Sequence, residues 1–299
     1  MNRLETEFLG VKFKNPLVGA SGTYGYGEDY KDYYPVDLIG GISSKGVTYN
    51  PKPGNSGIRL QETPSGLLNS IGLENPGIHE FVKHELKDMT SLGPKIFVNL
   101  GSNTLDEYLK SAEILNDYDF DFIELNISCP NVKEGGMAFG IKCESSEMIT
   151  RRIKNISKHK IVVKLSPNAE NIVENALAVE EGGADGISLV NTFLGMAIDL
   201  EKRKPVFDNV YAGLSGPAIK PIALRMVHQV SHAVKIPVMA IGGVAGYRDV
   251  LEFIMAGARL VQVGTYNFMN PYGVKEILED LEKYLEENDT TIEKFYKII

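Results

Sequence analysis

Short, nearly continuous apolar runs recur along this 299-residue chain, and they constrain its fold more than any other feature. The runs are rich in Val and Ile, and longer amphipathic stretches separate them. Strands of this kind are buried on both faces, as in a parallel sheet that helices cover on both sides. The sequence therefore predicts eight buried strands, at residues 16–19, 38–42, 96–98, 122–125, 161–163, 186–190, 236–241 and 260–263.

Helical patterns lie between most of these runs. In the first of them, Leu105, Tyr108, Leu109 and Ala112 follow one another at three- and four-residue spacings. We expect helices at residues 104–116, 168–181, 221–234, 246–255 and 271–285. Strands that alternate with helices predict an α/β fold, and eight such units favour a closed (β/α)8 TIM barrel over an open doubly wound sheet.

Two connections, residues 46–77 and 192–217, are too long to be plain turns. Insertions of this length in a compact domain usually serve as binding loops or lids, and we expect both at the carboxyl-end face of the barrel. No Ser- or Pro-rich linker interrupts the chain. We therefore expect residues 1–299 to form a single domain.

Composition and charge argue against several classes of protein. The net charge is −8, from 31 Lys and Arg against 39 Asp and Glu, whereas a nucleic-acid partner calls for a basic surface. Two cysteines, Cys129 and Cys143, are too few to ligate an iron–sulfur cluster within this chain. The most apolar stretch, residues 236–245, is too short to cross a membrane, and the first residues lack an apolar signal segment. We expect a cytoplasmic protein with no membrane partner.

Polar side chains follow the predicted strands, at the end of a barrel where active sites lie. Two are lysines, Lys45 and Lys164, and three are asparagines, Asn99, Asn126 and Asn191. A lysine at the end of a buried strand is partly desolvated and needs an anionic partner. An asparagine offers both donor and acceptor groups, which suits an amide-rich ring. A flavin fits these residues, because it combines a phosphate, a uracil-like edge and negative charge near N1 when it is reduced.

Glycines follow the last two strands. Gly242 and Gly243 end the seventh, and Gly264 and Thr265 end the eighth; Gly216 lies in the preceding long loop. Glycine lets backbone amides approach an anion closely, and barrels often bind a phosphate at this place. No G-x-G-x-x-G dinucleotide motif joins a strand to a helix, and the five histidines form no convincing ligand set, so we expect no metal site.

Cys129 is the strongest candidate for chemistry. It follows the fourth predicted strand, between Ser128 and Pro130, beside the polar cluster. Cys143 has no such context, and we assign it no role. The stretch 131–140 contains three glycines, Gly135, Gly136 and Gly140, and we interpret it as a mobile lid over the barrel mouth.

Five motifs, in order along almost the whole chain, together resemble the dihydroorotate dehydrogenases. They are Asn126-Ile127-Ser128-Cys129-Pro130-Asn131, Ser44-Lys45-Gly46, residues 69–75 (NSIGLEN), residues 163–167 (VKLSP) and residues 213–217 (GLSGP). The resemblance implies an FMN-containing barrel that oxidises (S)-dihydroorotate to orotate in pyrimidine biosynthesis.

The family has classes, and residues 131–140 are similar to the NAD-linked one. In that class the catalytic chain forms a homodimer core within a heterotetramer, and it pairs with an electron-transfer subunit that carries FAD and a [2Fe–2S] cluster. Quinone-linked members use a Ser base, whereas this chain has Cys129. A homodimeric fumarate-linked enzyme is the alternative within the family. Three alternatives lie outside the family: another FMN barrel such as a tRNA-dihydrouridine synthase, a phosphosugar isomerase or lyase without a flavin, and a non-catalytic barrel that serves as a binding subunit.

The resemblance also assigns roles residue by residue. Cys129 is the base that removes the C5 proton while the C6 hydride passes to FMN. The positions that match FMN-binding residues are Ala20, Ser21, Lys45, Gly46, Asn99, Asn126, Lys164, Val190, Gly216, Gly242, Gly243, Gly264 and Thr265. The positions that match substrate-binding residues are Lys45, Asn69, Ser70, Ile71, Gly72, Leu73, Asn126, Asn191 and Thr192.

Overall fold

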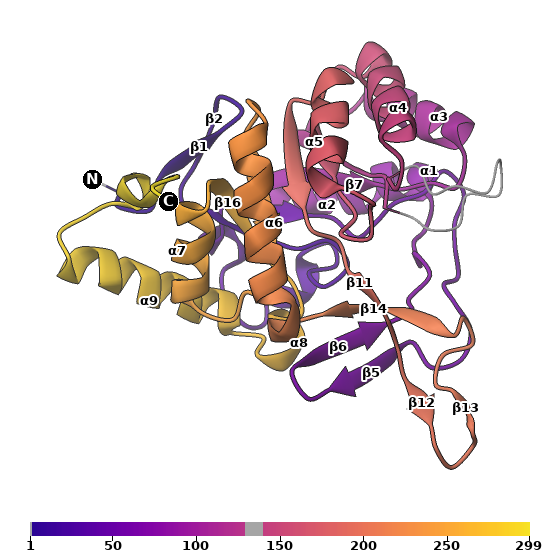
Figure 1. Ribbon diagram of the computed structural model, residues 1–299. Helices are drawn as coiled ribbons and strands as arrows, with labels where there is room; N and C mark the ends of the chain where they lie inside the picture. The colour runs from indigo at the N-terminus through magenta and orange to yellow at the C-terminus, as the bar shows by residue number, and fades with distance from the viewer. Residues whose placement is uncertain (1, 129–139) are drawn as a thin grey trace.

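The computed structural model describes residues 2–128 and 140–299, and its centre is a closed barrel of eight parallel strands (Figure 1). The predicted (β/α)8 TIM barrel is confirmed, because each predicted run overlaps one barrel strand. Around the barrel the strands follow one another in the order β3, β4, β7, β8, β9, β10, β15 and β16, and β16 then pairs with β3. Their bounds are β3 (Leu17–Gly19), β4 (Gly41–Ser43), β7 (Lys95–Leu100), β8 (Phe122–Asn126), β9 (Lys160–Lys164), β10 (Gly186–Leu189), β15 (Val238–Ile241) and β16 (Ala258–Val263).

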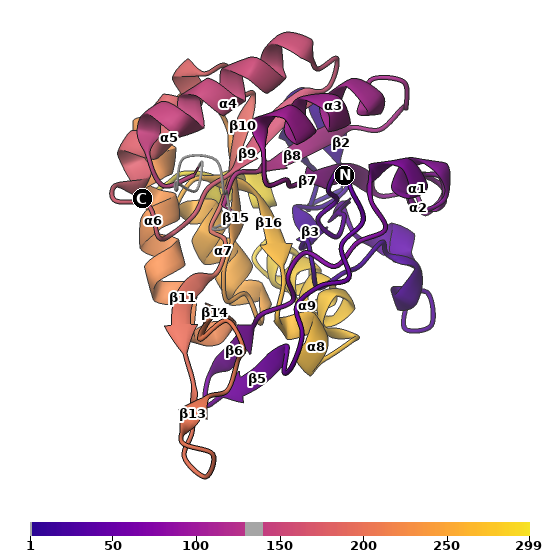
Figure 2. The same cartoon turned by 90° about the vertical axis from the view of Figure 1, so that its right-hand side faces the viewer.

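Helices lie outside the barrel and cover its strands (Figure 2). Polar caps fix where some of them begin: Thr104 accepts from the amide of Glu107 at the start of α3, and Asn171 accepts from the amides of Val173 and Glu174 at the start of α5. The described helices are α1 (Ile78–Lys83), α2 (Glu85–Ser91), α3 (Leu105–Leu115), α4 (Cys143–Ile156), α5 (Ile172–Glu181), α6 (Lys220–Ala233), α7 (Tyr247–Met255), α8 (Tyr266–Met269) and α9 (Gly273–Glu287).

The first connection departs from the regular pattern. Between β3 and β4 the chain makes two 3₁₀ turns, η1 (Glu28–Tyr30) and η2 (Val36–Leu38), in place of an α-helix. Two further turns of this kind are η3 (Pro217–Ile219), before α6, and η4 (Ile292–Phe295), after α9.

A hairpin of β1 (Thr6–Phe8) and β2 (Val11–Phe13) packs against the amino-terminal end of the barrel. Its Phe8 and Phe13 are buried against Phe97 and Phe122, with ring centroids 6.0 Å apart for Phe8 and Phe122 and 6.2 Å apart for Phe13 and Phe122. The apolar cluster also contains side chains from β3, β9, β15 and β16. Apolar side chains therefore fill the inside of the barrel at its amino-terminal end.

The two long insertions pair with each other in one antiparallel sheet. Its strands are β11 (Phe193–Met196), β14 (Tyr211–Ser215), β6 (Gly66–Asn69) and β5 (Leu60–Thr63), in that order. A ribbon of β12 (Ile198–Asp199) and β13 (Lys204–Pro205) extends this sheet away from the barrel (Figure 1). We predicted binding loops or lids here, and the structure shows that the two insertions hold each other in place through the pairing of β6 with β14.

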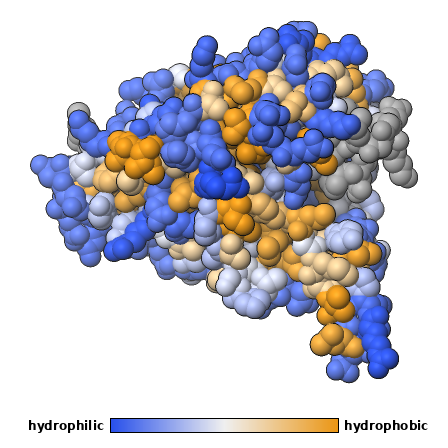
Figure 3. Space-filling model, in the orientation of Figure 1, coloured by the Kyte–Doolittle hydropathy of each residue, from blue (hydrophilic) through white to orange (hydrophobic). Residues whose placement is uncertain are grey.

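Strand β11 and the projecting ribbon that follows it leave large apolar side chains in solvent. Leu194, Ile198 and Leu200 are 64%, 59% and 81% exposed. Figure 3 shows apolar side chains along this projection. Among residues 2–128 and 140–299, no helix is both long and apolar enough to cross a bilayer.

We predict that Phe13→Ala destabilises the fold by about 3–5 kcal/mol, because the ring is buried and a cavity would remain at the barrel base. Urea unfolding measures the loss. The neighbouring Lys12→Ala is the control: the Lys12 side chain is exposed and forms a surface ion pair with Glu5, so its removal costs about 1 kcal/mol or less. Equal effects of the two variants would contradict the role of the hairpin as a plug.

Candidate functional site

The predicted rim asparagines lie next to one another at the carboxyl end of the barrel. Asn191 Nδ2 donates to Asn126 Oδ1 at 3.4 Å, and Asn126 Nδ2 donates to Asn99 Oδ1 at 3.4 Å. Tyr108 fixes Asn126 from behind, because its hydroxyl donates to the Asn126 carbonyl at 2.7 Å. Three strand ends therefore present one line of amides, as the sequence predicted.

Beneath this line, Glu124 lies fully buried inside the barrel. Its Oε2 accepts hydrogen bonds from Ser43 Oγ and Asn99 Nδ2, both at 2.6 Å. Its Oε1 accepts from Ser188 Oγ at 2.8 Å and from Gln262 Nε2 at 2.7 Å. The Lys164 ammonium is 3.8 Å from Oε2. One carboxylate thus joins side chains from β4, β7, β9, β10 and β16 to its own strand, β8.

The surroundings of Glu124 keep it ionised. Burial raises the pKa of this carboxyl, but the positive charge of Lys164 and the hydrogen bonds from Ser43, Ser188 and Asn99 lower it further than burial raises it. The resulting pKa is below the ordinary Glu value. Glu124 therefore faces Lys164 as an ionised carboxylate.

Lys164 itself has free donor capacity. Its side chain is 6% exposed, and within residues 2–128 and 140–299 its ammonium donates no hydrogen bond. A buried ammonium needs acceptors for its three protons. Lys164 therefore points to an anionic or carbonyl-bearing ligand at the rim.

Two of the residues predicted to bind substrate, Asn69 and Thr192, meet at the sheet of the two insertions. Asn69 Nδ2 donates to the Gly213 carbonyl at 3.0 Å, where β6 pairs with β14. Thr192 lies against the same glycine, since a Cβ on Gly213 would be 2.2 Å from Thr192 Oγ1. The sheet thus brings together two side chains that are 123 positions apart in the sequence.

The segment 70–73 is fastened by Asn55, which donates from its backbone to the Ile71 carbonyl and from its side chain to Ser70. Leu73 packs close to Gly46, because a Cβ on Gly46 would be 3.1 Å from Leu73 Cδ2. Lys45 also faces this segment, with its ammonium 3.7 Å from Glu74 Oε2. Arg59 binds the same carboxylate oxygen at 3.0 Å. Segment 70–73 therefore lies beside the rim lysine.

Three glycine-bearing segments meet at the predicted phosphate site. Gly216 and Gly243 have φ values of +96° and +74°, and a Cβ on Gly243 would be 2.8 Å from the Gly216 carbonyl. Thr265 joins them, since its hydroxyl donates to Ser215 Oγ at 2.8 Å. The described residues offer no acceptor to the backbone amides of Gly243, Gly264 and Thr265. Close glycine backbone with free amides fits a phosphate group.

The remaining predicted FMN positions border this cradle. Gly264 approaches Ala20, whose Cβ would be 3.6 Å from a Cβ on Gly264, and Ser21 is the next residue along the chain. Val190 packs near Gly242, at 3.7 Å from a Cβ on that glycine. The cradle, the amide line and Lys164 together match the phosphate, polar ring edge and anionic edge of FMN.

Cys129 and residues 131–139 of the predicted lid lie outside the described residues. The chain on either side of them is anchored at the carboxyl end of the barrel. Ser128 Oγ donates to the Lys164 carbonyl at 3.2 Å, and the Gly140 amide donates to the Ile127 carbonyl at 2.9 Å. Cys143 is poorly suited to act as a base in its place, because burial and the carboxylates of Glu174 and Glu144 raise the pKa of its thiol.

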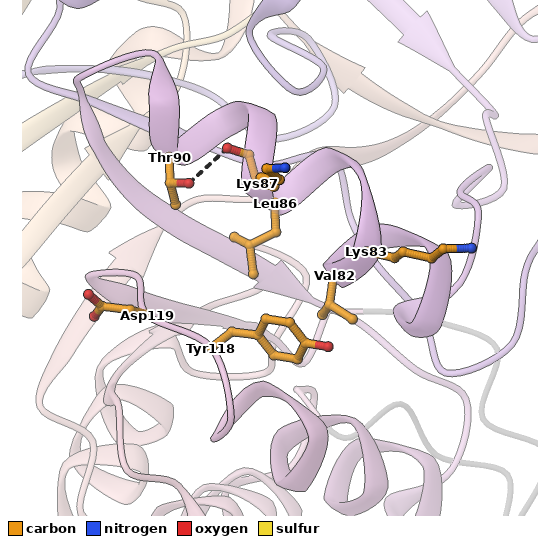
Figure 4. A pocket seen from close by; sticks show the side chains of 7 residues that line it. All are labelled: Val82, Lys83, Leu86, Lys87, Thr90, Tyr118 and Asp119. Carbon is orange, nitrogen blue, oxygen red and sulfur yellow. Dashed lines mark hydrogen bonds between the residues drawn. The ribbon is translucent and has the colours of Figure 1, made fainter.

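A surface hollow on the outer wall is separate from this site (Figure 4). It lies between α1, α2 and the loop after α3, and its one drawn hydrogen bond is local, from Thr90 Oγ1 to the Lys87 carbonyl. Its lining residues are Val82, Lys83, Leu86, Lys87, Thr90, Tyr118 and Asp119. None of them belongs to the barrel rim.

The sequence interpretation missed Glu124 and its partners Ser43, Ser188 and Gln262. A signal was present, because Glu124 is the one charged residue in the run Phe122-Ile123-Glu124-Leu125. Glu124 lies two residues before the end of its strand, one layer below the polar residues at the strand ends.

The chain is similar to known proteins over almost its whole length. The family model described as dihydroorotate dehydrogenase matches residues 3–285. A protein of Petrotoga mobilis is 52% identical over 99% of this chain and 99% of its own length, and one of Brachyspira hyodysenteriae is 51% identical over 97% and 96%. A third, from Porphyromonas gingivalis, is 48% identical over 95% and 94%. All three bear the name dihydroorotate dehydrogenase B (NAD(+)), catalytic subunit.

Proposed function

We propose the function of this chain from one premise: it belongs to the dihydroorotate dehydrogenase family. It is an oxidoreductase that converts (S)-dihydroorotate to orotate in pyrimidine biosynthesis. The observation that carries this proposal is the match over residues 3–285, together with about 50% identity to NAD-linked catalytic subunits. A match of this extent favours dihydroorotate oxidation over the tRNA-modifying, phosphosugar and non-catalytic alternatives.

FMN is the proposed cofactor, and the described residues fit it. The amides of Gly243, Gly264 and Thr265 would hold the phosphate, and the Gly216 carbonyl lies beside Gly243, 2.8 Å from where a Cβ on that residue would be. Lys164 would face the edge of the ring that becomes anionic on reduction. When bound, FMN supplies the acceptor for the hydride that leaves C6 of the substrate.

The substrate is bound by residues that the two insertions and the strand ends provide. Lys45 would pair with the carboxylate of dihydroorotate, while Asn69, Asn126 and Asn191 donate to and accept from its ring amides. The line of hydrogen bonds from Asn191 to Asn99 orients these groups before substrate arrives. The chain therefore fixes the pyrimidine without a large rearrangement of side chains.

Cys129 is the proposed base, by its place in the Asn126–Asn131 motif. The C5 proton is acidic because it is α to a carbonyl, and a thiolate at Cys129 would take it. A free thiol has a pKa of about 8.5, so only a small fraction is thiolate at neutral pH. The rate should therefore rise on the alkaline side.

We predict that Cys129→Ala lowers kcat about 10²- to 10⁴-fold without reducing FMN content, because it removes the base and leaves the flavin site intact. Steady-state oxidation of dihydroorotate and the flavin absorbance measure the two quantities. Cys143→Ala is the matched control and should keep wild-type activity. Full activity in Cys129→Ala would remove this residue from the mechanism.

We predict that Gly243→Ala weakens FMN binding at least about tenfold. Alanine at a φ of +74° is strained, and its Cβ would collide with the Gly216 carbonyl. Gly246→Ala is the control, because a Cβ on Gly246 meets nothing within 4 Å and its φ is not in the left-handed region. Reconstitution of the apoprotein with FMN measures both affinities, and equal affinities would contradict the phosphate site.

The proposed partner is an electron-transfer subunit that carries FAD and a [2Fe–2S] cluster and passes electrons to NAD⁺ in the cytoplasm. Two cysteines in this chain are too few for the cluster, and the relatives are named catalytic subunits of NAD-linked enzymes. We further propose a homodimer core, for which the exposed Leu194, Ile198 and Leu200 offer apolar surface.

Co-purification from the native host tests this class. We expect a second chain with FAD and iron, and dihydroorotate-dependent reduction of NAD⁺ only when both chains are present. A purified chain that reduces fumarate alone, with no partner, would instead assign it to the homodimeric fumarate-linked class.

A further inference from the structure

We propose that Glu124 is a positioning residue for the flavin reaction: it holds Lys164 and Asn99 in place and offsets the charge that Lys164 presents to the cofactor. This inference rests on the proposed function, because it concerns residues that would face FMN. Glu124 itself lies one layer below the rim, two residues before Asn126 on β8.

The geometry supports the positioning part of this role. Four hydrogen bonds of 2.6–2.8 Å occupy both oxygens of the Glu124 carboxylate, so its orientation is fixed. Asn99 donates from its Nδ2 to this carboxylate, and its Oδ1 accepts from Asn126 Nδ2. The orientation of the rim amides therefore depends on Glu124.

The distances support the electrostatic part. Lys164 Nζ is 3.8 Å from Glu124 Oε2, which is close enough for a strong charge interaction but too long for a hydrogen bond. Among residues 2–128 and 140–299 the ammonium therefore keeps its protons for a ligand, while the carboxylate below it offsets part of its charge. A buried ion pair is a weak source of stability, because an apolar core of similar volume serves as well. The arrangement is better explained by what it does to the ligand.

Charge balance has a direct consequence for a flavin at this rim. A lone buried lysine would strongly favour the anionic reduced flavin, whereas a lysine paired with a carboxylate favours it less. Glu124 therefore keeps the reduction potential of the bound flavin lower than Lys164 alone would set it. A lower potential helps electrons leave for the next carrier.

The test is an anaerobic redox titration of the FMN-loaded protein with Glu124→Gln, which keeps the size of the side chain and removes its charge. We expect the ratio of reduced to oxidised flavin at a given potential to rise about tenfold, equivalent to about 30 mV for a two-electron couple. Asp185→Asn is the matched control. Asp185 pairs with Lys154 at 2.5 Å and accepts from the Ile161 amide at the opposite end of the barrel, so this variant should keep the wild-type potential.

Two further variants separate charge from position. Glu124→Asp keeps the charge but cannot reach all four donors, so we expect a near-wild-type potential and weaker FMN binding to the apoprotein.

If Glu124→Gln does not fold, the exchange E124Q/Q262E replaces it. The exchange keeps a carboxylate and an amide in contact but moves the charge to β16, which two strands separate from β9. The exchange should therefore also raise the ratio of reduced to oxidised flavin at a given potential.

Wild-type potentials in both Glu124→Gln and the exchange, or a lowered potential in either, would overturn the inference. Failure of the proposed function would look different, because dihydroorotate would not reduce the flavin of the FMN-loaded wild-type chain. A wild-type chain that binds FMN, with variants that leave its potential unchanged, contradicts only the role of Glu124.

Discussion

The functional end of the barrel depends on the hydrogen bonds and the charge pair that the buried carboxylate of Glu124 forms. Six of the eight strands place a side chain in its network, and the hydrogen bonds within it are short. A charge inside a barrel is tolerated only when its partners satisfy it completely, so each of these side chains is constrained by the others. The network also holds the rim residues in place, because Asn99 and Lys164 contact Glu124 below and lie at the rim themselves.

The barrel separates this polar layer from an apolar base. Phe8 and Phe13 from the amino-terminal hairpin pack with Phe97 and Phe122 at one end, and polar side chains begin one layer above them on the same strands. Asn99 follows Phe97 by two residues, and Glu124 follows Phe122 by two, so each pair points to the same side of its strand. Stability and chemistry are thus assigned to opposite ends, and residues at the rim are free to serve a ligand.

Sequence reasoning could predict the barrel and most rim positions, because buried parallel strands carry a continuous apolar signal and their carboxyl ends follow directly in the chain. The pairing of β6 with β14 was not predictable in this way, since it joins segments about 145 residues apart that carry no local mark of each other. Glu124 was missed for another reason: alternation tells which residues share a face, but in a closed barrel both faces are buried. The β1–β2 hairpin, with strands of three residues, is too short for periodicity to show.

The proposed reaction requires that this rim hold a flavin that dihydroorotate can reduce. The most direct measurement is an anaerobic titration of the purified, FMN-loaded chain with dihydroorotate, followed by its visible absorption. We expect the flavin bands to bleach as about one equivalent of substrate is added, without any partner chain. Flavin that stays oxidised in the presence of excess dihydroorotate, in a chain that remains folded, would contradict the account.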